Sequence, residues 1–362
     1  MLRISDIKLG TDDTESDLRK KVLKLLGVKN VKSFEISKKS IDARKKPDIH
    51  YVYSVDVETD NEEYYAKKIK NSQIVKKKTY EFPKCGKIDK PVVIVGTGPA
   101  GLMCGLTLAQ NGYKVILLER GKCVEERMKD VEAFWEAGFL NPESNVQFGE
   151  GGAGTFSDGK LTTGTHDPRL THVMETFVAA GAPEDILWQH KPHVGTDLLR
   201  QVVTNLRKEI QALGGEVRFG HRLSGLTLAG KQLTEIQVDQ GRVAYTMPCD
   251  TLILAPGHSA RDTFRMLRQA GAAMEQKPFA IGVRIEHEQA RISRAQFGES
   301  WEKLPPADYK LVCHLPNGRS AYTFCVCPGG QIVAAASQPG GAVTNGMSNR
   351  ARDGKFINGG FL

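Results

Sequence analysis

A short apolar run that passes directly into a glycine-rich turn constrains this 362-residue chain more than any other feature. Residues 92–95 read Val-Val-Ile-Val, which is typical of a central parallel strand buried on both faces. Residues 96–101, Gly-Thr-Gly-Pro-Ala-Gly, follow at once, and the apolar residues of 102–112 recur at helical spacing. Residues 114–118 then supply a second strand, which closes with Glu119. The segment predicts a complete βαβ unit in about 30 residues.

The glycines of this turn have the Gly-x-Gly-x-x-Gly spacing of a dinucleotide-binding site, in the strand–turn–helix setting that the pattern needs. Gly96 permits the tight turn, Gly98 lets the backbone approach a pyrophosphate, and Gly101 allows close packing of helix and strand. The helix, which begins near Pro99, offers unpaired N–H groups and a positive dipole end to the phosphates. Glu119 can accept both hydroxyls of an adenosine ribose, and its charge disfavours the 2′-phosphate of NADP. A glycine-rich turn without a ligand is the alternative.

Residues 149–154, Gly-Glu-Gly-Gly-Ala-Gly, match the same spacing but lack its setting, because no buried strand precedes them and 155–160 is a poor helix start. We therefore expect a loop whose backbone N–H groups cradle a flavin ring or its ribityl phosphate arm. Ser157, Asp158 and Lys160 would be its polar contacts, and a lysine near the pyrimidine end can stabilise the anionic reduced ring. An ordinary surface loop is the alternative.

The positive charge of the chain is concentrated in its first quarter. Residues 1–90 hold 22 Lys and Arg against 15 Asp and Glu, a net +7, whereas the whole chain has a net charge of +8. A basic module can bind nucleic acid or an acidic protein. Because residues 1–90 contain no aromatic stacking motif or helix-turn-helix pattern, a solvated lysine-rich surface is the plainer interpretation.

The start of the chain and its cysteines favour a cytoplasmic protein without membrane contact. The first 16 residues have charges where a secretory signal would need an apolar stretch, and no later segment approaches the ~20 apolar residues of a membrane span. Seven scattered cysteines are typical of free thiols in a reducing compartment. No metal-ligand spacing is present among them.

Patterning divides the chain into three parts. Residues 1–85 predict a small basic α+β domain, with strands over 2–9, 31–37 and 50–57 and helices over 15–26 and 62–70. A lysine-rich run over 76–90 is the expected linker.

The dinucleotide-binding domain is expected over 91–275, with a helical insertion at about 166–195. Its later elements are predicted as a helix over 196–213, a strand over 217–219, a β-meander over 222–247 and a buried strand over 251–255. From Lys277 onward Phe279, Ile281, Val283 and Ile285 alternate with other residues, which indicates an antiparallel sheet and a separate substrate domain over 276–362.

Several strings together resemble one family: VVIVGTGPAGL, LLER, QFGEGGAGTFSDGKL, TLILAPGHSARDTF and KPFAIGVRIEH. They are similar to bacterial FAD-dependent dehydrogenases that carry a ferredoxin-like domain before the flavin fold. The resemblance extends from about Ile4 to Lys355 and implies a Rossmann-like three-layer α/β domain that binds FAD. The residues it assigns to the cofactor are Gly96, Gly98, Pro99, Ala100, Gly101, Glu119, Arg120, Gly151, Gly152, Ala153, Gly154, Thr155, Ser157, Asp158, Lys160, Leu223, Ala255, Pro256 and Gly257.

One departure from the family pattern concerns the carboxyl terminus. Flavoproteins of this architecture finish with a strand and a Gly-Asp motif, whereas this sequence stops at Gly359-Gly360-Phe361-Leu362. We expect a truncated chain that retains FAD weakly and is poorly soluble, because a missing strand leaves an unpaired sheet edge.

Candidates for the reaction itself are few. Cys325 and Cys327 stand two apart on a predicted strand, which puts both thiols on one face and makes a redox pair beside flavin one interpretation; two half-buried cysteines before a turn is the other. Arg284 could hold an anionic substrate, with His287 nearby, or both could point outward from a strand. His258 is a proton-donor candidate or simply a helix-entry residue.

The sequence predicts an FAD-dependent oxidoreductase that relays hydride to or from an organic substrate, with NAD(P)H as a transient electron donor. One alternative is an RNA- or protein-binding module in which residues 1–90 bind the partner and the flavin unit senses redox state. Another is a simple NAD-dependent dehydrogenase. The loop over 149–160 and the late LILAPG strand favour the flavin type, because a simple NAD domain continues with strand–helix alternation.

Overall fold

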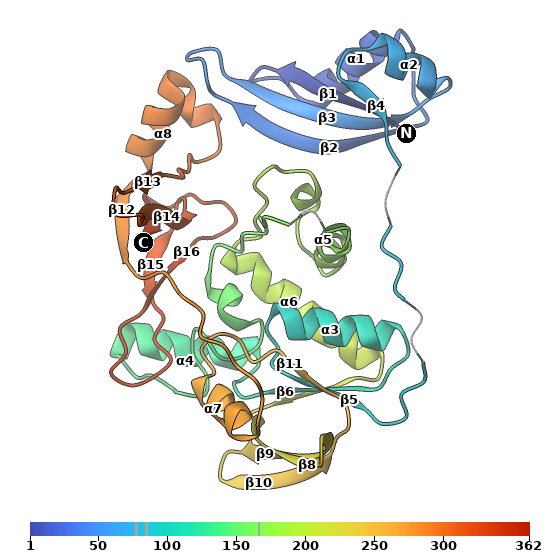
Figure 1. The fold of residues 1–362 in the computed structure, drawn as a ribbon. Helices are drawn as coiled ribbons and strands as arrows, with labels where there is room; N and C mark the ends of the chain where they lie inside the picture. The colour runs from blue at the N-terminus through green and yellow to red at the C-terminus, as the bar shows by residue number, and fades with distance from the viewer. Residues whose placement is uncertain (77–78, 84–85, 166) are drawn as a thin grey trace.

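The computed structural model describes residues 1–76, 79–83, 86–165 and 167–362, and its elements fall into three parts (Figure 1). The first part runs strand, helix, strand, strand, helix, strand, and its four strands form an antiparallel sheet in the order β2-β3-β1-β4. This is a ferredoxin-like arrangement. Its elements are β1 (Leu2–Leu9), α1 (Glu15–Leu26), β2 (Ser33–Asp42), β3 (His50–Glu58), α2 (Glu62–Lys68) and β4 (Ser72–Ile74).

The ends of α1 lie where the sequence places a capping residue and a glycine. The Thr14 hydroxyl accepts from the Asp17 amide while the Asp17 carboxylate accepts from the Thr14 amide, and Gly27 ends the helix in the left-handed conformation. Leu18 and Val22, four residues apart, are fully buried against the sheet. Capping and apolar spacing together explain why the predicted bounds of this helix match the observed ones.

The second part is built on a parallel four-stranded sheet in the order β11-β5-β6-β7. The βαβ unit predicted from the glycine turn forms its centre as β5, α3 and β6. The elements of this part are β5 (Val92–Val95), α3 (Pro99–Gln110), β6 (Val115–Glu119), α4 (Val124–Ala137), η1 (Gly152–Phe156), α5 (Arg169–Ala179), η2 (Glu184–Leu187), α6 (Thr196–Ala212), β7 (Glu216–Phe219), β8 (Arg222–Ala229), β9 (Gln232–Gln240), β10 (Val243–Pro248), β11 (Leu252–Leu254) and α7 (Arg261–Gln269).

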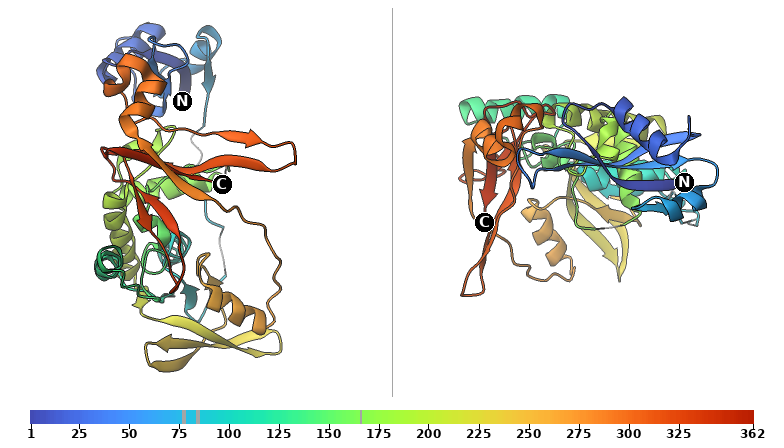
Figure 2. Two further views of the ribbon diagram at one scale, coloured as in Figure 1. Left: turned by 90° about the vertical axis from the view of Figure 1, so that its left-hand side faces the viewer. Right: turned by 90° about the horizontal axis from the view of Figure 1, so that it is seen from above.

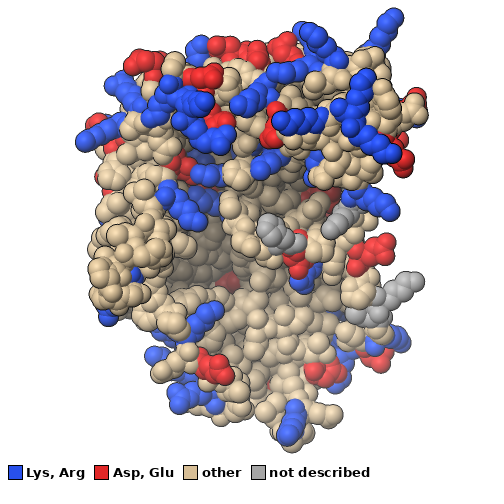
Figure 3. Space-filling model, turned by 45° about the horizontal axis from the view of Figure 1, so that its top comes forward, with Lys and Arg blue, Asp and Glu red and all other residues tan. Residues whose placement is uncertain are grey.

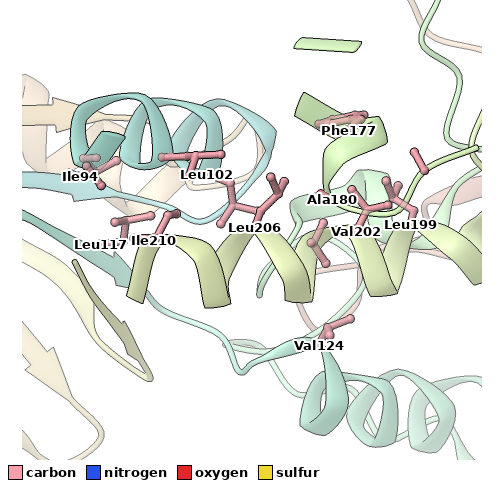
Figure 4. Close-up of a cluster of buried hydrophobic side chains, with 14 of the residues drawn as sticks. Ile94, Leu102, Leu117, Val124, Phe177, Ala180, Leu199, Val202, Leu206 and Ile210 are labelled. Carbon is pink, nitrogen blue, oxygen red and sulfur yellow. The ribbon is translucent and has the colours of Figure 1, made fainter. Parts of the chain in front are cut away.

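Alternation along the parallel strands separates two buried layers. Ile94 and Leu117 face α3 and α6, where they pack with residues such as Leu102 and Ile210 (Figure 4). Their strand neighbours, Val93 among them, face the antiparallel meander β8–β10 on the other side. The sheet is therefore the middle of three layers. The sequence predicts this arrangement, because the strand residues are apolar on both faces and both faces must be covered.

The third part is a second antiparallel sheet in the order β12-β17-β14-β13, with a separate β15–β16 hairpin. Figure 2 shows α8 extending from this part toward the amino-terminal sheet. The elements are β12 (Val283–Glu288), α8 (Gln289–Phe297), η3 (Gly298–Lys303), β13 (Val312–His314), β14 (Ser320–Cys327), β15 (Gln331–Ala334), β16 (Thr344–Met347) and β17 (Phe356–Phe361).

The outer strand of the first sheet, β2, is joined to the helical insertion by backbone hydrogen bonds. The Lys39 amide donates to the Trp188 carbonyl at 2.8 Å, and the His190 amide donates to the Lys39 carbonyl at 3.0 Å. On another side, the Lys46 ammonium donates to the Ala295 carbonyl in α8. The first part therefore contacts both other parts of the chain.

Two expectations of local structure differ from the observed fold. The alternating residues Phe279 and Ile281 do not lie in a strand, since β12 begins only at Val283, where the paired length of its neighbour β17 ends. Residues 152–156, expected as an irregular loop, form the short 3-10 helix η1. The expected linker over 76–90 falls partly outside the described residues.

The longest helix of the described residues, α6, has 17 residues and is charged on one side. Within that part of the chain, no helix combines the length and the apolar character needed to cross a membrane.

Candidate cofactor-binding site

The three glycines of the turn after β5 meet different surroundings. Gly96 has a φ of 101°, and a Cβ there would lie 2.2 Å from the carbonyl oxygen of Ala255. A Cβ on Gly101 would lie 1.8 Å from the Gly96 carbonyl oxygen, so helix and turn touch at this point. Gly98 is different, because a Cβ there would meet its nearest atom, in Gly152, only at 3.9 Å. Two of the glycines are needed for packing, and the third leaves open space.

Helix α3 presents its amino terminus to that open space. Gly98 is the N-cap and has no side chain to cap the helix, and Pro99 occupies the first turn. The first amides of a helix have no partner within it, and the helix dipole places partial positive charge there. The turn therefore forms a binding site for an anion such as a phosphate.

A cavity of about 430 Å³ opens beside this helix end. Its size falls in the usual range of ligand pockets. Twelve of the nineteen residues expected to hold the cofactor line it: Gly96, Gly98, Pro99, Ala100, Glu119, Arg120, Gly152, Ala153, Leu223, Ala255, Pro256 and Gly257.

The second glycine string packs onto the first. The Gly151 amide donates to the Thr97 carbonyl at 2.8 Å, and Gly152 and Ala153 reach the cavity wall. The other residues expected to bind from this part of the chain do not line the cavity: Gly151, Gly154, Thr155, Ser157, Asp158 and Lys160. Gly101 lies behind the turn and does not line it either.

Glu119 lies at the cavity, but its carboxylate is engaged by the protein itself. One oxygen accepts from the amide and the hydroxyl of Thr97 at 2.9 and 2.8 Å. The other accepts from the amides of Gly121 and Gly149 at 2.9 and 3.0 Å. Because a carboxylate offers about four acceptor positions, ribose hydroxyls could bind Glu119 only by displacing a donor. In this structure, Glu119 joins the two glycine loops.

A buried arginine, Arg127 in α4, supports the second glycine loop from behind. Its guanidinium is fully buried and donates to four carbonyl oxygens, those of Asn145, Val146, Glu150 and Gly152. Burial lowers the pKa of Arg127 to about 10, which still leaves it charged at neutral pH. Sequence reasoning missed this residue, since nothing in the helical pattern of 124–137 distinguishes an inward arginine from an exposed one.

Glu150, inside the second glycine string, is also fully buried. One carboxylate oxygen accepts from the Val124 amide at 2.8 Å, and the other lies 3.1 Å from Nε of Arg207 without an aligned hydrogen bond. Burial raises the pKa of Glu150 to about 7. Its protonation state therefore changes near neutral pH, within the same loop whose neighbouring residues Gly149 and Gly152 line the cavity.

Charged and aromatic side chains complete one wall of the cavity. Arg120 lies 4.2 Å from the ring centroid of Phe148 and forms ion pairs with Glu143 and Asp262. Arg222 lines the same wall and shares both carboxylates. Sequence reasoning identified Arg120 but missed Phe148 and Arg222. Phe148 directly precedes the second glycine string, and Arg222 directly precedes Leu223, which the resemblance assigns to the cofactor.

Asp158 and Lys160 belong to a second cluster, near β14. Asp158 is fully buried, and it accepts from Arg352 at 2.9 Å and from the Ser348 hydroxyl. Lys160 pairs with Asp158 at 3.1 Å and reaches the sulfur of Cys327 at 3.6 Å. The structure thus brings two sets of candidate residues together, but away from the lining of the cavity.

The remaining reaction candidates are dispersed. Arg284 is part of the third sheet, where it donates to Asn358 at 2.5 Å and to the Cys325 carbonyl at 3.4 Å. His287 stacks edge-on against Tyr309 and lines a hollow together with Glu288 and Arg291. His258 lines the cofactor cavity.

The residues present fit a dinucleotide with a pyrophosphate. Gly98 keeps a side chain out of the cavity wall, the α3 amides face the same space, and Ala255 to Gly257 close it from the end of β11. These features define a dinucleotide-binding α/β fold, in which the ligand site lies at the carboxyl ends of parallel strands.

Comparison with protein families gives the assignment. Residues 90–297 match the pyridine nucleotide-disulphide oxidoreductase family, 278–362 match the C-terminal domain-like family of FAD-dependent proteins, and 1–58 match a domain of unknown function. The chain belongs to the pyridine nucleotide-disulphide oxidoreductase family, and FAD is its cofactor. The resemblance to FAD-dependent oxidoreductases is thereby confirmed.

Individual relatives and solved structures match this chain to very different extents. An uncharacterized protein of Clostridium beijerinckii is 46% identical over 361 residues, which cover 97% of this chain and 67% of the relative. Glycerol-3-phosphate dehydrogenase from Bacillus halodurans, solved with FAD, is 10% identical, with a TM-score of 0.36 over 75% of this chain and 47% of that one. THI4 of Thermovibrio ammonificans is 17% identical, with a TM-score of 0.33 over 51% and 63%.

Proposed function

We propose that this chain is an FAD-dependent oxidoreductase that passes hydride to or from an organic substrate, with NADH or NADPH as a donor that binds transiently. The observation that carries the proposal is the uncapped amino terminus of α3, which faces a cavity at Gly98. When bound, FAD supplies a ring that accepts or gives two electrons. The family name, which includes pyridine nucleotides, supports the choice of donor.

The residues of the chain would bind and orient the cofactor rather than carry out the chemistry. The α3 amides would hold the pyrophosphate, and the Arg120–Phe148 wall would border the nucleotide. Arg127 would keep the second glycine loop in shape, because its four carbonyl contacts leave that loop little freedom. The proposed division of labour is a basic first domain, a cofactor domain over 91–275 and a substrate domain over 276–362.

Gly98→Val tests the cofactor site directly. The valine side chain would occupy the open space at the cavity wall, so we expect FAD binding at least tenfold weaker, or about 1.4 kcal/mol. Quenching of flavin fluorescence on titration with protein measures the affinity. Gly164→Ala is the matched control, because a Cβ there meets nothing within 4 Å and the residue lies outside the cavity. Equal affinity of Gly98→Val and the unaltered chain would contradict the site.

The donor is tested separately on the flavin-loaded chain. Under anaerobic conditions, NADH or NADPH should bleach the visible flavin absorbance. If neither does so while FAD still binds, the nicotinamide donor is rejected and the cofactor assignment stands.

A second function, binding of an acidic partner or RNA by the first domain, is supported by one observation. Figure 3 shows many Lys and Arg side chains over the upper part of the molecule, with Asp and Glu among them. In the first domain several charged side chains are paired, including Lys20 with Asp17 and Lys32 with Asp60. The interleaving of both signs favours a solvated surface, and salt-dependent RNA binding by the full chain would favour the second function.

A further inference from the structure

A second cavity, of about 440 Å³, lies where the three parts of the chain meet, and we call it the junction cavity. Its lining comes from β2, from the helical insertion between α5 and α6, from α8 and residues 305–308, and from residues 350–352 after β16. Among the described residues, none of this lining also borders the cofactor cavity. The volume is that of a pocket for a small organic ligand, and such pockets occur preferentially between domains.

One wall of the junction cavity is apolar and belongs to a packed interface. Ile41 and Ala43 of β2 lie in one hydrophobic cluster with Phe297 of α8 and with Ala307. Phe297 and Ala307 are buried, and all four residues line the cavity. Because the cluster joins the first part of the chain to the third, core packing fixes the shape of this wall. A hydrophobic ligand body would bury apolar surface against it.

The remaining lining is polar and carries more positive than negative charge. Four cations line the cavity together with two carboxylates: Lys39, Lys191, Arg350 and Arg352, with Asp185 and Asp308. Three of these cations are ion-paired, two with the carboxylates of the lining and one with the fully buried Asp158. One positive charge, that of Lys39, is therefore left without a counter-ion.

Lys39 is surrounded by aromatic rings instead of carboxylates. Within the described residues it forms no ion pair, whereas its Nζ lies 4.4 Å from the ring centroid of Tyr51. The ring centroids of Tyr53 and Trp188 follow at 5.5 and 5.8 Å. Burial lowers the pKa of Lys39, because the rings replace part of its water. A partly buried cation of this kind is best satisfied by an anion.

The groups around Lys39 are held in place without a ligand. The Lys39 amide and carbonyl are hydrogen bonded to Trp188 and His190. The Arg350 guanidinium donates to the His193 carbonyl, and the Arg350 carbonyl oxygen lies 3.1 Å from His193 Nε2. Burial lowers the pKa of both histidines, that of His193 to about 4, so neither adds charge at neutral pH. Such a fixed wall keeps the entropic cost of binding low.

We propose that the junction cavity binds a small organic anion. Its apolar body would lie against the wall that contains Phe297, and its carboxylate or phosphate group would pair with the ammonium of Lys39. The ligand would contact all three parts of the chain and so stabilise the folded protein. The proposal does not depend on the FAD proposal, because the two cavities have different linings.

Three naphthalene probes of similar shape test the chemistry. The full chain, with FAD at saturation to occupy the cofactor cavity, is titrated with 1-naphthoate, 1-naphthyl phosphate and the neutral 1-naphthamide in a calorimeter. We expect at least one of the two anions to bind with a Kd about tenfold or more below that of the amide. The tighter anion identifies the ligand as a carboxylate or a phosphate monoester. Equal affinity for all three probes, or no binding of either anion, would overturn the proposal.

Lys39→Gln tests the residue that carries the argument. The substitution removes the charge but keeps the backbone hydrogen bonds of Lys39, so the fold should persist. We expect about tenfold or more weaker anion binding and unchanged naphthamide binding. Lys24→Gln, which removes an exposed lysine of α1 outside the cavity, is the matched control and should bind as the unaltered chain does. Unchanged anion binding by Lys39→Gln, or equal weakening by Lys24→Gln, would overturn the proposal.

Ala351→Trp tests the location independently of charge. Ala351 is exposed and lines the cavity, so an indole there would occupy the ligand volume without disturbing a buried core. All three probes should lose binding, while circular dichroism and the unfolding midpoint without probe stay as in the unaltered chain. A folded Ala351→Trp variant that binds the anions with full affinity would place them elsewhere and overturn the proposal.

Discussion

Lys160 and Cys327 are in contact, with Nζ 3.6 Å from Sγ, although 167 residues separate them in the chain. The contact joins the segment after the second glycine string to the sheet of the third part. Asp158 strengthens this connection through Arg352 and Ser348, which lie on the carboxyl-terminal side of β16. The second and third parts of the chain are therefore linked by an ionic cluster around the buried Asp158.

Asp158→Asn should weaken that cluster. Burial opposes ionisation of Asp158, but the hydrogen bond from Arg352 and the charge of Lys160 outweigh it and hold the pKa below the usual 3.8. A carboxyl with a depressed pKa stabilises the fold above its unfolded pKa and loses that contribution as the pH falls through the folded value. We expect a loss of about 3 kcal/mol at pH 7 and a smaller difference below pH 4. Urea unfolding at both pH values measures it, and a pH-independent difference would contradict it.

Arg127→Met should destabilise the chain by about 3–5 kcal/mol. The substitution keeps an unbranched apolar stem but leaves four buried carbonyl oxygens without their donor. Arg127→Lys keeps the charge but has fewer directed donors, so its free energy of unfolding should lie between those of Arg127→Met and the unaltered chain. Urea unfolding gives the free energies. If Arg127→Met were as stable as the unaltered chain, the four contacts would have no energetic weight.

Glu150→Gln should change the pH dependence of stability between about pH 4.5 and 7. The folded-state pKa of Glu150 is raised by burial to about 7, so the folded chain binds more protons than the unfolded one in this window, and its stability falls as the pH rises. The glutamine variant lacks this slope. The difference in unfolding free energy between the glutamine variant and the unaltered chain should therefore shift by about 3 kcal/mol in favour of the variant between pH 4 and a pH above 7. Parallel slopes for both proteins would place the carboxylate in a more polar setting.

Gly101→Ala should unfold the chain more readily than Gly98→Ala. The added methyl at 101 would meet the Gly96 carbonyl oxygen at 1.8 Å, so turn and helix must separate, at a cost of about 1–3 kcal/mol. At position 98 the methyl meets no atom closer than 3.9 Å, and stability should change by less than about 0.5 kcal/mol. Thermal unfolding without FAD compares the pair, and reversed effects would contradict the assigned roles of these glycines.

Local signals predicted much of the fold. Apolar residues at helical spacing predicted α1 over 15–26, and the glycine spacing in its strand–helix setting predicted the turn after β5. The three-layer arrangement follows from apolar strands that must be covered on both faces. Each of these inferences depends on residues within one or two turns of each other.

Long-range pairing explains what sequence reasoning missed. Cys325 lies in a bulge of β14 that arises from pairing with β17, about 30 residues later, whereas alternation alone predicts a regular strand. The carboxylate of Glu119 binds the Thr97, Gly121 and Gly149 donors, a set that forms only after both loops have folded. A list of sequence motifs does not show which motif supplies the hydrogen-bond donors or acceptors of another.

The bridge between Lys39 and residues 188–190 limits how the first domain can move. A strand at the rim of a sheet would ordinarily be free to accept a foreign strand, yet here that rim is occupied by the chain itself. Swinging the domain away would require two backbone hydrogen bonds to break together with the Lys46 contact to α8. A displacement of the first domain would therefore act directly on the helical insertion through these two backbone hydrogen bonds.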